Sequence, residues 1–460
     1  MSKPHILIFP APAQGHITSM LKLAELLCAA PGFRVTFLVP AYIHRRLSNH
    51  SNATSRLRKL PFRLHPIPDN GHQEDIRPGS FDVKDWLDSL RMTAQPSLKE
   101  LLADEGDPID CVISDGILSF VLEAAEEAGV PVFYMRTLSA CAFWVYFCLP
   151  HLIQTQELPF NSNELDLPMV NLRGMEGVLR RSDLPSCCRH GLDSRSMQTI
   201  MHQTLQTPRA KGLILNTFDH LEAPTLDLIR TRIPNLYTVG PLHAHLQTRL
   251  TAIPNSSSTS LWEEDKTCLK WLDEQPENSV IYVSFGSIVR VTVEERTEFW
   301  QGLVNSGKRF LWVVRPDSGG IIPPEIADGG MGRVVGWAPQ EAVLAHPAVG
   351  GFLTHCGWNS TLESVVAGVP MVCWPHFGDQ QVNSRFVDDV WGIGRDMKDC
   401  CDRVVVEKMV RDVMEDRGGE FRRRAGDMAK AARESVVEGG TSYSDLDRLI
   451  RDIRDLCNAI

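Results

Sequence analysis

The sequence predicts an α/β fold of two similar-sized domains, each built on a parallel sheet, that face each other across a cleft. Short runs rich in Val and Ile alternate with stretches of helical periodicity, a pattern typical of βαβ units. A polar segment from Leu246 to Ser260 interrupts the alternation, which then starts again. The length of 460 residues also favours more than one domain.

The first series of elements occupies the N-terminal half of the chain. A buried strand is predicted over His5 to Phe9, and apolar residues recur at helical spacing between Ile17 and Cys28. Further strands are predicted over Arg34 to Val39, Asp110 to Ser114, Val130 to Tyr134 and Gly212 to Asn216. We therefore assign residues 1–245 to the first domain and residues 246–262 to a linker.

The second series defines a domain at residues 263–440. Its predicted strands are Val280 to Ser284, Phe310 to Val314, Gly350 to Thr354 and Val369 to Cys373. A charged helix at 441–460 follows, and we expect it to pack back on the first domain, with Asp445 and Asp447 on its solvated surface. Ligands of open parallel sheets bind beyond the carboxyl ends of the strands, so functional residues are expected there.

Composition argues against several classes of protein. With 57 acidic and 47 basic residues the formal charge is −10, which disfavours a nucleic-acid partner. The apolar run Ile6 to Phe9 stops at Pro10, too soon for a signal peptide, and no stretch approaches the ~20 apolar residues of a membrane-spanning helix. The twelve cysteines are scattered without a CxxC spacing, which predicts reduced structural thiols and a cytoplasmic protein.

One segment of the second domain combines a strand, a glycine-containing turn and a helix start. The strand Gly350 to Thr354 is followed by the turn His355 to Trp358. We expect Asn359 or Ser360 to cap the next helix, which ends at Gly368. The free N–H groups and the dipole at such a helix start suit a phosphate group.

The residue pattern alone also allows structural roles for several of these side chains. Glu363 lies at the spacing of a capping box from the helix start. Trp337 and Trp358 are typical of core packing. His16, between the first strand and the first helix, fits a plain helix N-terminus, and Ser287 fits an ordinary strand-to-helix turn.

The whole segment 337–380, which includes the sequence HCGWNS, resembles the 44-residue signature box of plant family 1 UDP-glycosyltransferases. The match has no gaps, and the length and motif order of the remaining chain agree with it. The resemblance implies the GT-B fold, in which two Rossmann-like domains face a cleft and the donor binds mainly to the C-terminal one. It also implies transfer of a sugar from a UDP-sugar to a small plant metabolite.

The resemblance implies a donor site as well. Its residues would be Ser287, Trp337, Ala338, Gln340, His355, Trp358, Asn359, Ser360, Glu363, Asp379 and Gln380. Among them, Trp337 would stack on uracil, Glu363 would accept hydrogen bonds from the ribose hydroxyls, and His355 would lie with the diphosphate-binding residues. Gln380 matches a position where family members that use glucose usually carry glutamine, so UDP-glucose is the expected co-substrate.

A catalytic pair is implied in the same way. His16 matches the family's general base, and an imidazole suits this task because it titrates near neutral pH. Asp115 matches the aspartate that orients the base, a pairing that the sequence alone would not suggest. The implied reaction is a direct displacement with inversion at the anomeric carbon, without metal or other cofactor, and we expect a monomer.

The family places most acceptor contacts on the N-terminal domain. Candidate acceptor residues here are Phe81, Trp86, Thr137, Phe143, Trp144, His376 and Phe377. Phe143 and Trp144 are equally typical of core packing. A terpenoid such as an iridoid is the favoured acceptor, and a flavonoid or other phenol is the alternative. A protein that binds a UDP-sugar without transferring it, a different UDP-sugar donor and a nucleotide-sugar epimerase are the competing hypotheses.

Overall fold

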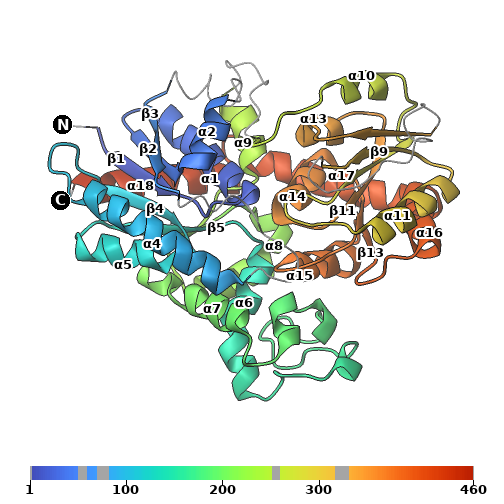
Figure 1. Ribbon diagram of the computed structural model, residues 1–460, viewed down its shortest axis with the longest axis horizontal. Helices are drawn as coiled ribbons and strands as arrows, with labels where there is room; N and C mark the ends of the chain where they lie inside the picture. Colours follow the sequence, from blue (N-terminus) through green and yellow to red (C-terminus); the bar gives the residue numbers. More distant parts are fainter. Residues whose placement is uncertain (1–2, 50–59, 70–81, 251–259, 316–330, 459–460) are drawn as a thin grey trace.

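The structure is a computed structural model that describes residues 3–49, 60–69, 82–250, 260–315 and 331–458. Within these ranges the chain forms two parallel sheets flanked by helices, and Figure 1 shows the two resulting domains side by side. The predicted α/β class of fold is confirmed.

The N-terminal domain contains a parallel sheet with the strand order β3-β2-β1-β4-β5-β6-β7. Its strands are β1 His5–Phe9, β2 Arg34–Pro40, β3 Phe62–Ile67, β4 Cys111–Asp115, β5 Val132–Arg136, β6 Gly212–Leu215 and β7 Leu236–Thr238. The order reverses between β1 and β4. The loops that follow these two strands therefore open on one crevice.

Helices connect these strands and cover the sheet. They are α1 Gln14–Ala29, α2 Ala41–Asn49, α4 Val83–Leu102, α5 Ser119–Glu127, α6 Ala140–Gln154, α7 Arg195–Leu205, α8 Asp219–Arg230 and α9 Leu242–Arg249. The helix α9 extends past Leu246, where the linker was predicted to begin. Leu246 is buried against the core of this domain, which explains the longer helix.

The C-terminal domain repeats the design with the strand order β10-β9-β8-β11-β12-β13. Its strands are β8 Val280–Ser284, β9 Arg309–Val313, β10 Gly332–Val335, β11 Val349–Thr354, β12 Met371–Cys373 and β13 Gly394–Asp396. Its helices are α10 Thr267–Asp273, α11 Val293–Asn305, α13 Gln340–Leu344, α14 Trp358–Ala367, α15 Gln380–Arg385, α16 Arg403–Arg411 and α17 Gly418–Ser435. The reversal here lies between β8 and β11, so the turns after these strands form the second crevice.

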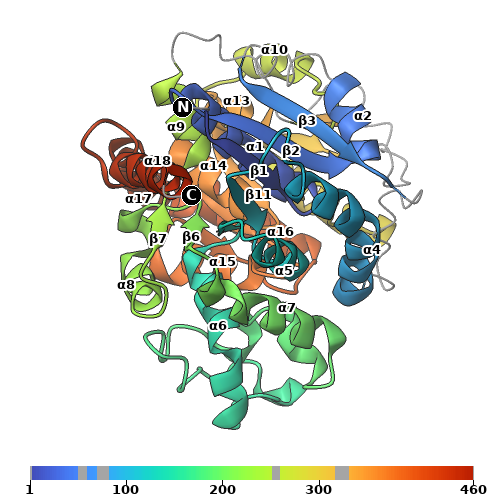
Figure 2. The same ribbon diagram turned by 90° about the vertical axis from the view of Figure 1, so that its left-hand side faces the viewer.

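The last helix, α18 (Thr441–Asn458), packs on the N-terminal domain, beside β7 in Figure 2. Asp445 accepts hydrogen bonds from the N–H and the hydroxyl of Thr238, both over 2.8 Å, and Tyr237 donates to Asp452 over 2.7 Å. Asp445 keeps only part of its predicted surface exposure, 20%, because its carboxylate also accepts from the end of β7. Asp447 is 48% exposed, in agreement with its predicted surface position.

The cysteine side chains lie mostly in the interior of the protein. All twelve cysteines are free thiols, and nine of them are buried. None of the helices in the described ranges combines the length and the apolar character that a membrane crossing requires.

Asp445→Ala is expected to lower the melting temperature of the protein, measured by differential scanning calorimetry. The substitution leaves the Thr238 N–H without its acceptor in a partly buried position, a loss of about 1–3 kcal/mol. Asp447→Ala is the matched control, because it removes an exposed ion pair with Arg249 worth about 0–1 kcal/mol. Equal melting temperatures for the two variants would contradict the docking role of Asp445.

Candidate active site

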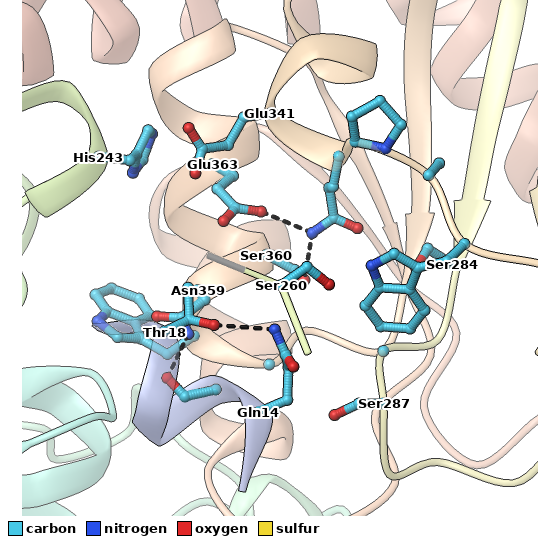
Figure 3. Close-up of a pocket in the computed structure, with 18 of the residues that line it drawn as sticks. Gln14, Thr18, His243, Ser260, Ser284, Ser287, Glu341, Asn359, Ser360 and Glu363 are labelled. Atoms are coloured by element: carbon cyan, nitrogen blue, oxygen red, sulfur yellow. Dashed lines mark hydrogen bonds between the residues drawn. The ribbon is translucent and has the colours of Figure 1, made fainter. Parts of the chain in front are cut away.

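A cavity of about 580 Å³ lies between the two domains. The N-terminal domain lines it with residues of α1 and α9 and with Thr137, and the C-terminal domain lines it with α13, α14 and the turns after β8 and β11. Figure 3 shows side chains from both sides, with Gln14 and Thr18 of α1 near Asn359 of α14. The carboxyl ends of both sheets thus meet at one site.

The loops after β1 and β4 bring His16 and Asp115 together. These strands are parallel neighbours, with Phe9 paired to Ser114, so the two residues emerge at the same edge of the sheet. His16 lies in the first turn of α1, and Asp115 is the last residue of β4. The Nδ1 atom of His16 is 2.5 Å from the Oδ2 atom of Asp115. Residues 99 positions apart in the chain therefore form a hydrogen-bonded pair.

Asp115 is buried but remains ionised. Burial alone raises the pKa of its carboxyl group, yet His16 and Arg136 oppose this effect and leave the pKa below its ordinary value. The backbone N–H groups of Ala11 and Ile117 also donate to the carboxylate, each over 3.3 Å. A carboxylate at Nδ1 favours the tautomer in which Nδ1 carries the proton and Nε2 keeps its lone pair.

His16 is also accessible to a ligand. Its side chain is 28% exposed, and both His16 and Thr137 line the cavity. The Thr137 hydroxyl lies 2.9 Å from Nδ1, on the same side of the ring as Asp115. The Nε2 atom is consequently the nitrogen that a ligand hydroxyl would meet.

The first turn of α14 lines the cavity from the opposite domain. The helix begins after Gly357 without a side-chain cap, so the predicted cap by Asn359 or Ser360 is wrong. Both residues lie inside the first turn, because the chain becomes helical directly after Gly357. Gly368 ends the helix in the left-handed conformation, with φ 73°, as predicted. The first N–H groups of a helix have no partner within it, so this point stabilises an anion.

His355 lies beside this anion site as a neutral group. Desolvation lowers the pKa of its imidazole to about 3. Two glycine turns enclose the ring: a Cβ atom at Gly286 would lie 2.6 Å from it, and one at Gly357 would lie 2.5 Å from it. Ser287, the next residue after Gly286, lines the cavity as well. A larger residue in either turn would displace the imidazole.

Gln340 connects the polar residues of α13 and α14. Its Nε2 atom donates to Ser360 Oγ over 2.8 Å and to Glu363 Oε2 over 2.7 Å, and Tyr282 donates to its Oε1 over 3.2 Å. Figure 3 draws the first two contacts as dashed lines. Glu363 thus contacts a neighbouring helix rather than the start of its own. Desolvation raises the pKa of its carboxyl group to about 7.

Asn359 and Trp358 tie the two domains together. The Asn359 amide donates to the Gly15 carbonyl over 2.8 Å and accepts from the Ser19 hydroxyl over 2.7 Å. Trp358 Nε1 donates to the carbonyl of Asn216 over 2.8 Å. These two side chains, which the resemblance assigns to the donor, have partners in the N-terminal domain, although both residues line the cavity.

Asp379 and Gln380 line the cavity at the start of α15. Asn383 donates to Asp379 over 2.8 Å, and desolvation raises the pKa of the Asp379 carboxyl group to about 6. The backbone N–H groups of His376 and Phe377 donate to Gln380 Oε1 over 2.8 and 3.1 Å. The turn thereby fixes the orientation of the Gln380 amide.

Trp262, Lys22 and His243 lie near Trp337 or line the cavity, although none of them was a predicted site residue. Trp337 stacks with Trp262, with ring centroids 5.8 Å apart. Lys22 of α1 and His243 of α9 line the cavity from the N-terminal domain. A signal for Lys22 was present in the sequence, since a lysine stands among the largely apolar residues of the first helix.

Thr137 and Phe377 are the predicted acceptor residues that line the cavity. His376 instead packs edge-on against Trp374, with ring centroids 3.9 Å apart, and desolvation lowers the pKa of its imidazole to about 4. Its backbone N–H orients Gln380, which gives His376 an indirect place at the site.

The other predicted acceptor residues lie elsewhere. Phe143 and Trp144 are buried in the core, 0% and 2% exposed, because α6 is covered on nearly all sides. Trp86, a residue of α4, is partly buried against the core of the N-terminal domain, and Phe81 lies outside the described residues. No cluster of three or more His, Cys, Asp or Glu in the described ranges is arranged to hold a metal ion.

Comparisons with known proteins agree on one family. A family model described as UDP-glucoronosyl and UDP-glucosyl transferase matches residues 246–418. The 7-deoxyloganetic acid glucosyltransferase of Catharanthus roseus is 50% identical, over 98% of this chain and 98% of its own length. The myricetin 3-O-rhamnoside 1,2-glucosyltransferase of Crocosmia x crocosmiiflora is 42% identical, over 99% and 97%. The chain belongs to the plant family 1 UDP-glycosyltransferases.

Comparison with solved structures identifies the fold of this UDP-glycosyltransferase. Os79 from O. sativa in complex with UDP has a TM-score of 0.84 at 29% identity and covers 97% of this chain and 100% of its own. The predicted GT-B fold is thereby confirmed, as is the predicted enzyme class. Its donor is a UDP-sugar, and its acceptor is a small molecule.

Gly286→Ala is expected to weaken UDP binding to this glycosyltransferase about tenfold or more, a loss of ~1.4 kcal/mol, measured by isothermal titration calorimetry. The new Cβ atom meets the His355 ring at 2.6 Å, so the imidazole must move away from the anion site.

Gly307→Ala provides the matched control for backbone strain. Gly307 has φ 68°, close to the 71° of Gly286, but a Cβ atom there meets nothing within 4 Å. We expect a loss of stability without a change in UDP affinity. Equal effects of the two substitutions on UDP affinity would contradict a contribution of His355 to UDP binding.

Proposed function

We propose that this UDP-glycosyltransferase transfers glucose from UDP-glucose to a hydroxyl group of an iridoid or related terpenoid, with inversion at the anomeric carbon. The observation that carries the proposal is the contact of His16 with Asp115, at a cavity whose opposite wall is the start of α14. The displacement requires a base for the acceptor and a stabilised leaving group for the donor. In this proposal the N-terminal domain supplies the base, and the C-terminal domain stabilises the leaving group.

The chemistry begins at Nε2 of His16, which accepts the proton of the acceptor hydroxyl while that oxygen bonds to the anomeric carbon. The bond from the anomeric carbon to the β-phosphate oxygen breaks, and its electron pair leaves with UDP. Asp115 stabilises the imidazolium that forms, and the imidazolium later releases its proton to solvent. Negative charge develops on the diphosphate, where the helix start and its N–H groups stabilise it. No metal or further cofactor takes part in this proposal.

The donor residues then take the roles that the resemblance implies. The diphosphate lies at the first turn of α14 with His355 and Ser360, and the uracil stacks on Trp337. Glu363 accepts from the ribose hydroxyls while Gln340 holds it in position, which their 2.7 Å hydrogen bond supports. Gln380 donates through Nε2 to a glucose hydroxyl, since the backbone already occupies its Oε1.

The acceptor is proposed from the comparison and from the cavity together. The 50% identity to a glucosyltransferase named for 7-deoxyloganetic acid supports an iridoid acceptor, with a carboxyl group as a second possible point of attachment. The relative that acts on a myricetin rhamnoside, at 42% identity, supports a phenolic acceptor as the alternative. Thr137 and Phe377 would contact the acceptor, because both line the cavity that contains His16.

The remaining expectations stay proposals. A protein that binds UDP-sugar without transfer is disfavoured, because the His16–Asp115 contact is intact. The free cysteines suit a reducing compartment, which supports a cytoplasmic location, and we propose a monomer.

A mass-spectrometric transfer screen tests the proposed reaction. The purified protein is incubated with UDP-glucose and a panel of iridoid, other terpenoid and phenolic aglycones, without added metal. One added hexose on the iridoids is the expected result. A product on phenolic aglycones alone would show that the acceptor is a phenol and not an iridoid. UDP binding without any product across several UDP-sugars would favour the alternative of a protein that binds the UDP-sugar without transferring it.

His16→Ala is expected to lower kcat about 10²–10⁴-fold, the typical contribution of a general base. UDP affinity should stay within about twofold, because the base and the nucleotide contacts lie on different domains. Turnover with the acceptor found in the screen and calorimetry with UDP measure the two effects.

Asp115→Asn is the companion variant, with the size of the side chain preserved. An amide at this position does not stabilise the imidazolium, so kcat should fall while UDP affinity is retained. A folded His16→Ala protein that loses turnover and UDP affinity equally would disprove the assignment of the base.

A further inference from the structure

The helix that carries His16 contacts the other domain along one face. Gly15 and Ser19 contact Asn359, and one turn later Lys22 reaches Glu341 of α13 and Glu363 of α14. The Nζ atom of Lys22 is 2.5 Å from Glu341 Oε1 and 3.8 Å from Oε1 of Glu363. The side chains of Lys22 and Glu363 are 9% and 10% exposed, so solvent screens their interaction poorly.

Charged and titratable groups from four helices face one another at this point. Lys22 and Glu25 come from α1, His243 from α9, Glu341 from α13 and Glu363 from α14. Figure 3 shows His243, Glu341 and Glu363 gathered at one end of the cavity. Burial lowers the pKa of Lys22, but the carboxylates outweigh this effect and raise it, so the side chain is an ammonium ion. Desolvation lowers the pKa of His243 to about 4, which leaves that ring uncharged near neutral pH.

We propose that Lys22 is a positioning residue of the donor site, which holds Glu363 of the opposite domain in the ionised form that binds the ribose. This inference rests on the proposed function, in which Glu363 accepts hydrogen bonds from the ribose hydroxyls. An ionised carboxylate only accepts, whereas a protonated carboxyl group turns one oxygen into a donor. His16 and Lys22 both belong to α1. The contact of this helix with the C-terminal domain therefore positions the base and also keeps Glu363 negatively charged.

The effect of Lys22 on the charge of Glu363 is measurable, because opposing effects bring the pKa of Glu363 close to neutral pH. Desolvation raises the pKa of Glu363 to about 7, Lys22 lowers it, and Glu341 raises it. A carboxyl group is ionised above its pKa, so the site loses ribose-binding capacity as the pH falls through that value. Loss of an opposite charge at this distance shifts a pKa by about one unit or more, and the loss of Lys22 moves the transition upward in pH.

The test compares two probes, UDP and its 2′,3′-dideoxy analogue, by calorimetry at pH 7 and pH 9. For Lys22→Met we expect UDP affinity to fall about fivefold to tenfold at pH 7 and less than about twofold at pH 9, as the ionised fraction recovers. Affinity for the dideoxy analogue should not change, because it lacks the hydroxyls that Glu363 binds. Lys22→Arg keeps the charge and should restore the pH profile of the unmodified enzyme.

Ser19→Ala is the matched control, because it removes another interdomain contact of α1 without removing a charge. Its effect should be equal for both probes and at both pH values. If Lys22→Met behaves in the same way, Lys22 only joins the domains and the proposal is overturned.

Glu363→Gln distinguishes a failure of the proposed ribose contact from a failure of the proposed role of Lys22. If Glu363→Gln still binds UDP more tightly than the dideoxy analogue by the same factor, Glu363 does not bind the ribose. If that preference is lost in Glu363→Gln but Lys22→Met has the pH profile of the unmodified enzyme, Glu363 binds the ribose and Lys22 does not control its charge.

A second variant covers the case in which Lys22→Met does not fold, which circular dichroism shows. Glu341→Gln removes the negative charge that raises the pKa of Glu363 and leaves Lys22 facing Glu363. UDP affinity at pH 6 should then rise about twofold to fivefold. An unchanged or weaker affinity at that pH would contradict the electrostatic coupling.

Discussion

The contact between α1 and α14 is the constraint on which the active site depends, because neither domain contains a complete site. The N-terminal domain presents His16 from the first turn of α1, and the C-terminal domain presents the start of α14. Asn359 joins the two helices through Gly15 and Ser19. A shift of one sheet against the other would separate His16 from the start of α14, so the interdomain hydrogen bonds set the distance between these two walls of the cavity.

Desolvation shifts the pKa values of Asp115, His355 and Glu363, and the neighbours of each group decide its charge. Asp115 remains a carboxylate because His16 and Arg136 outweigh its burial. His355 is held neutral, because desolvation and the nearby His376 and Arg315 lower the pKa of its imidazole to about 3. Glu363 lies between these extremes, with its pKa near 7. One physical effect therefore yields a fixed anion, a fixed neutral group and a titratable one.

The C-terminal helix adds a second connection between the domains. It follows the second domain in the chain, but its apolar residues join the core of the first, and Asp445 accepts from the end of β7. This arrangement covers the edge strand β7, which is buried although it is the outermost strand of its sheet.

The sequence by itself determined the α/β class, the nine inner strands and the segment 337–380, which supplies many of the residues that line the cavity. The inner strands are buried on both faces, so each leaves a continuous apolar run that identifies it. The strands that escaped prediction, β3, β7, β10 and β13, are the edges of the two sheets, where the apolar runs are short or broken. Tertiary structure alone decided the pairing of His16 with Asp115, the uncapped start of α14 and the approach of Lys22 to Glu363. Those contacts depend on strand register and on the docking of two domains, which join residues that share no local pattern in the chain.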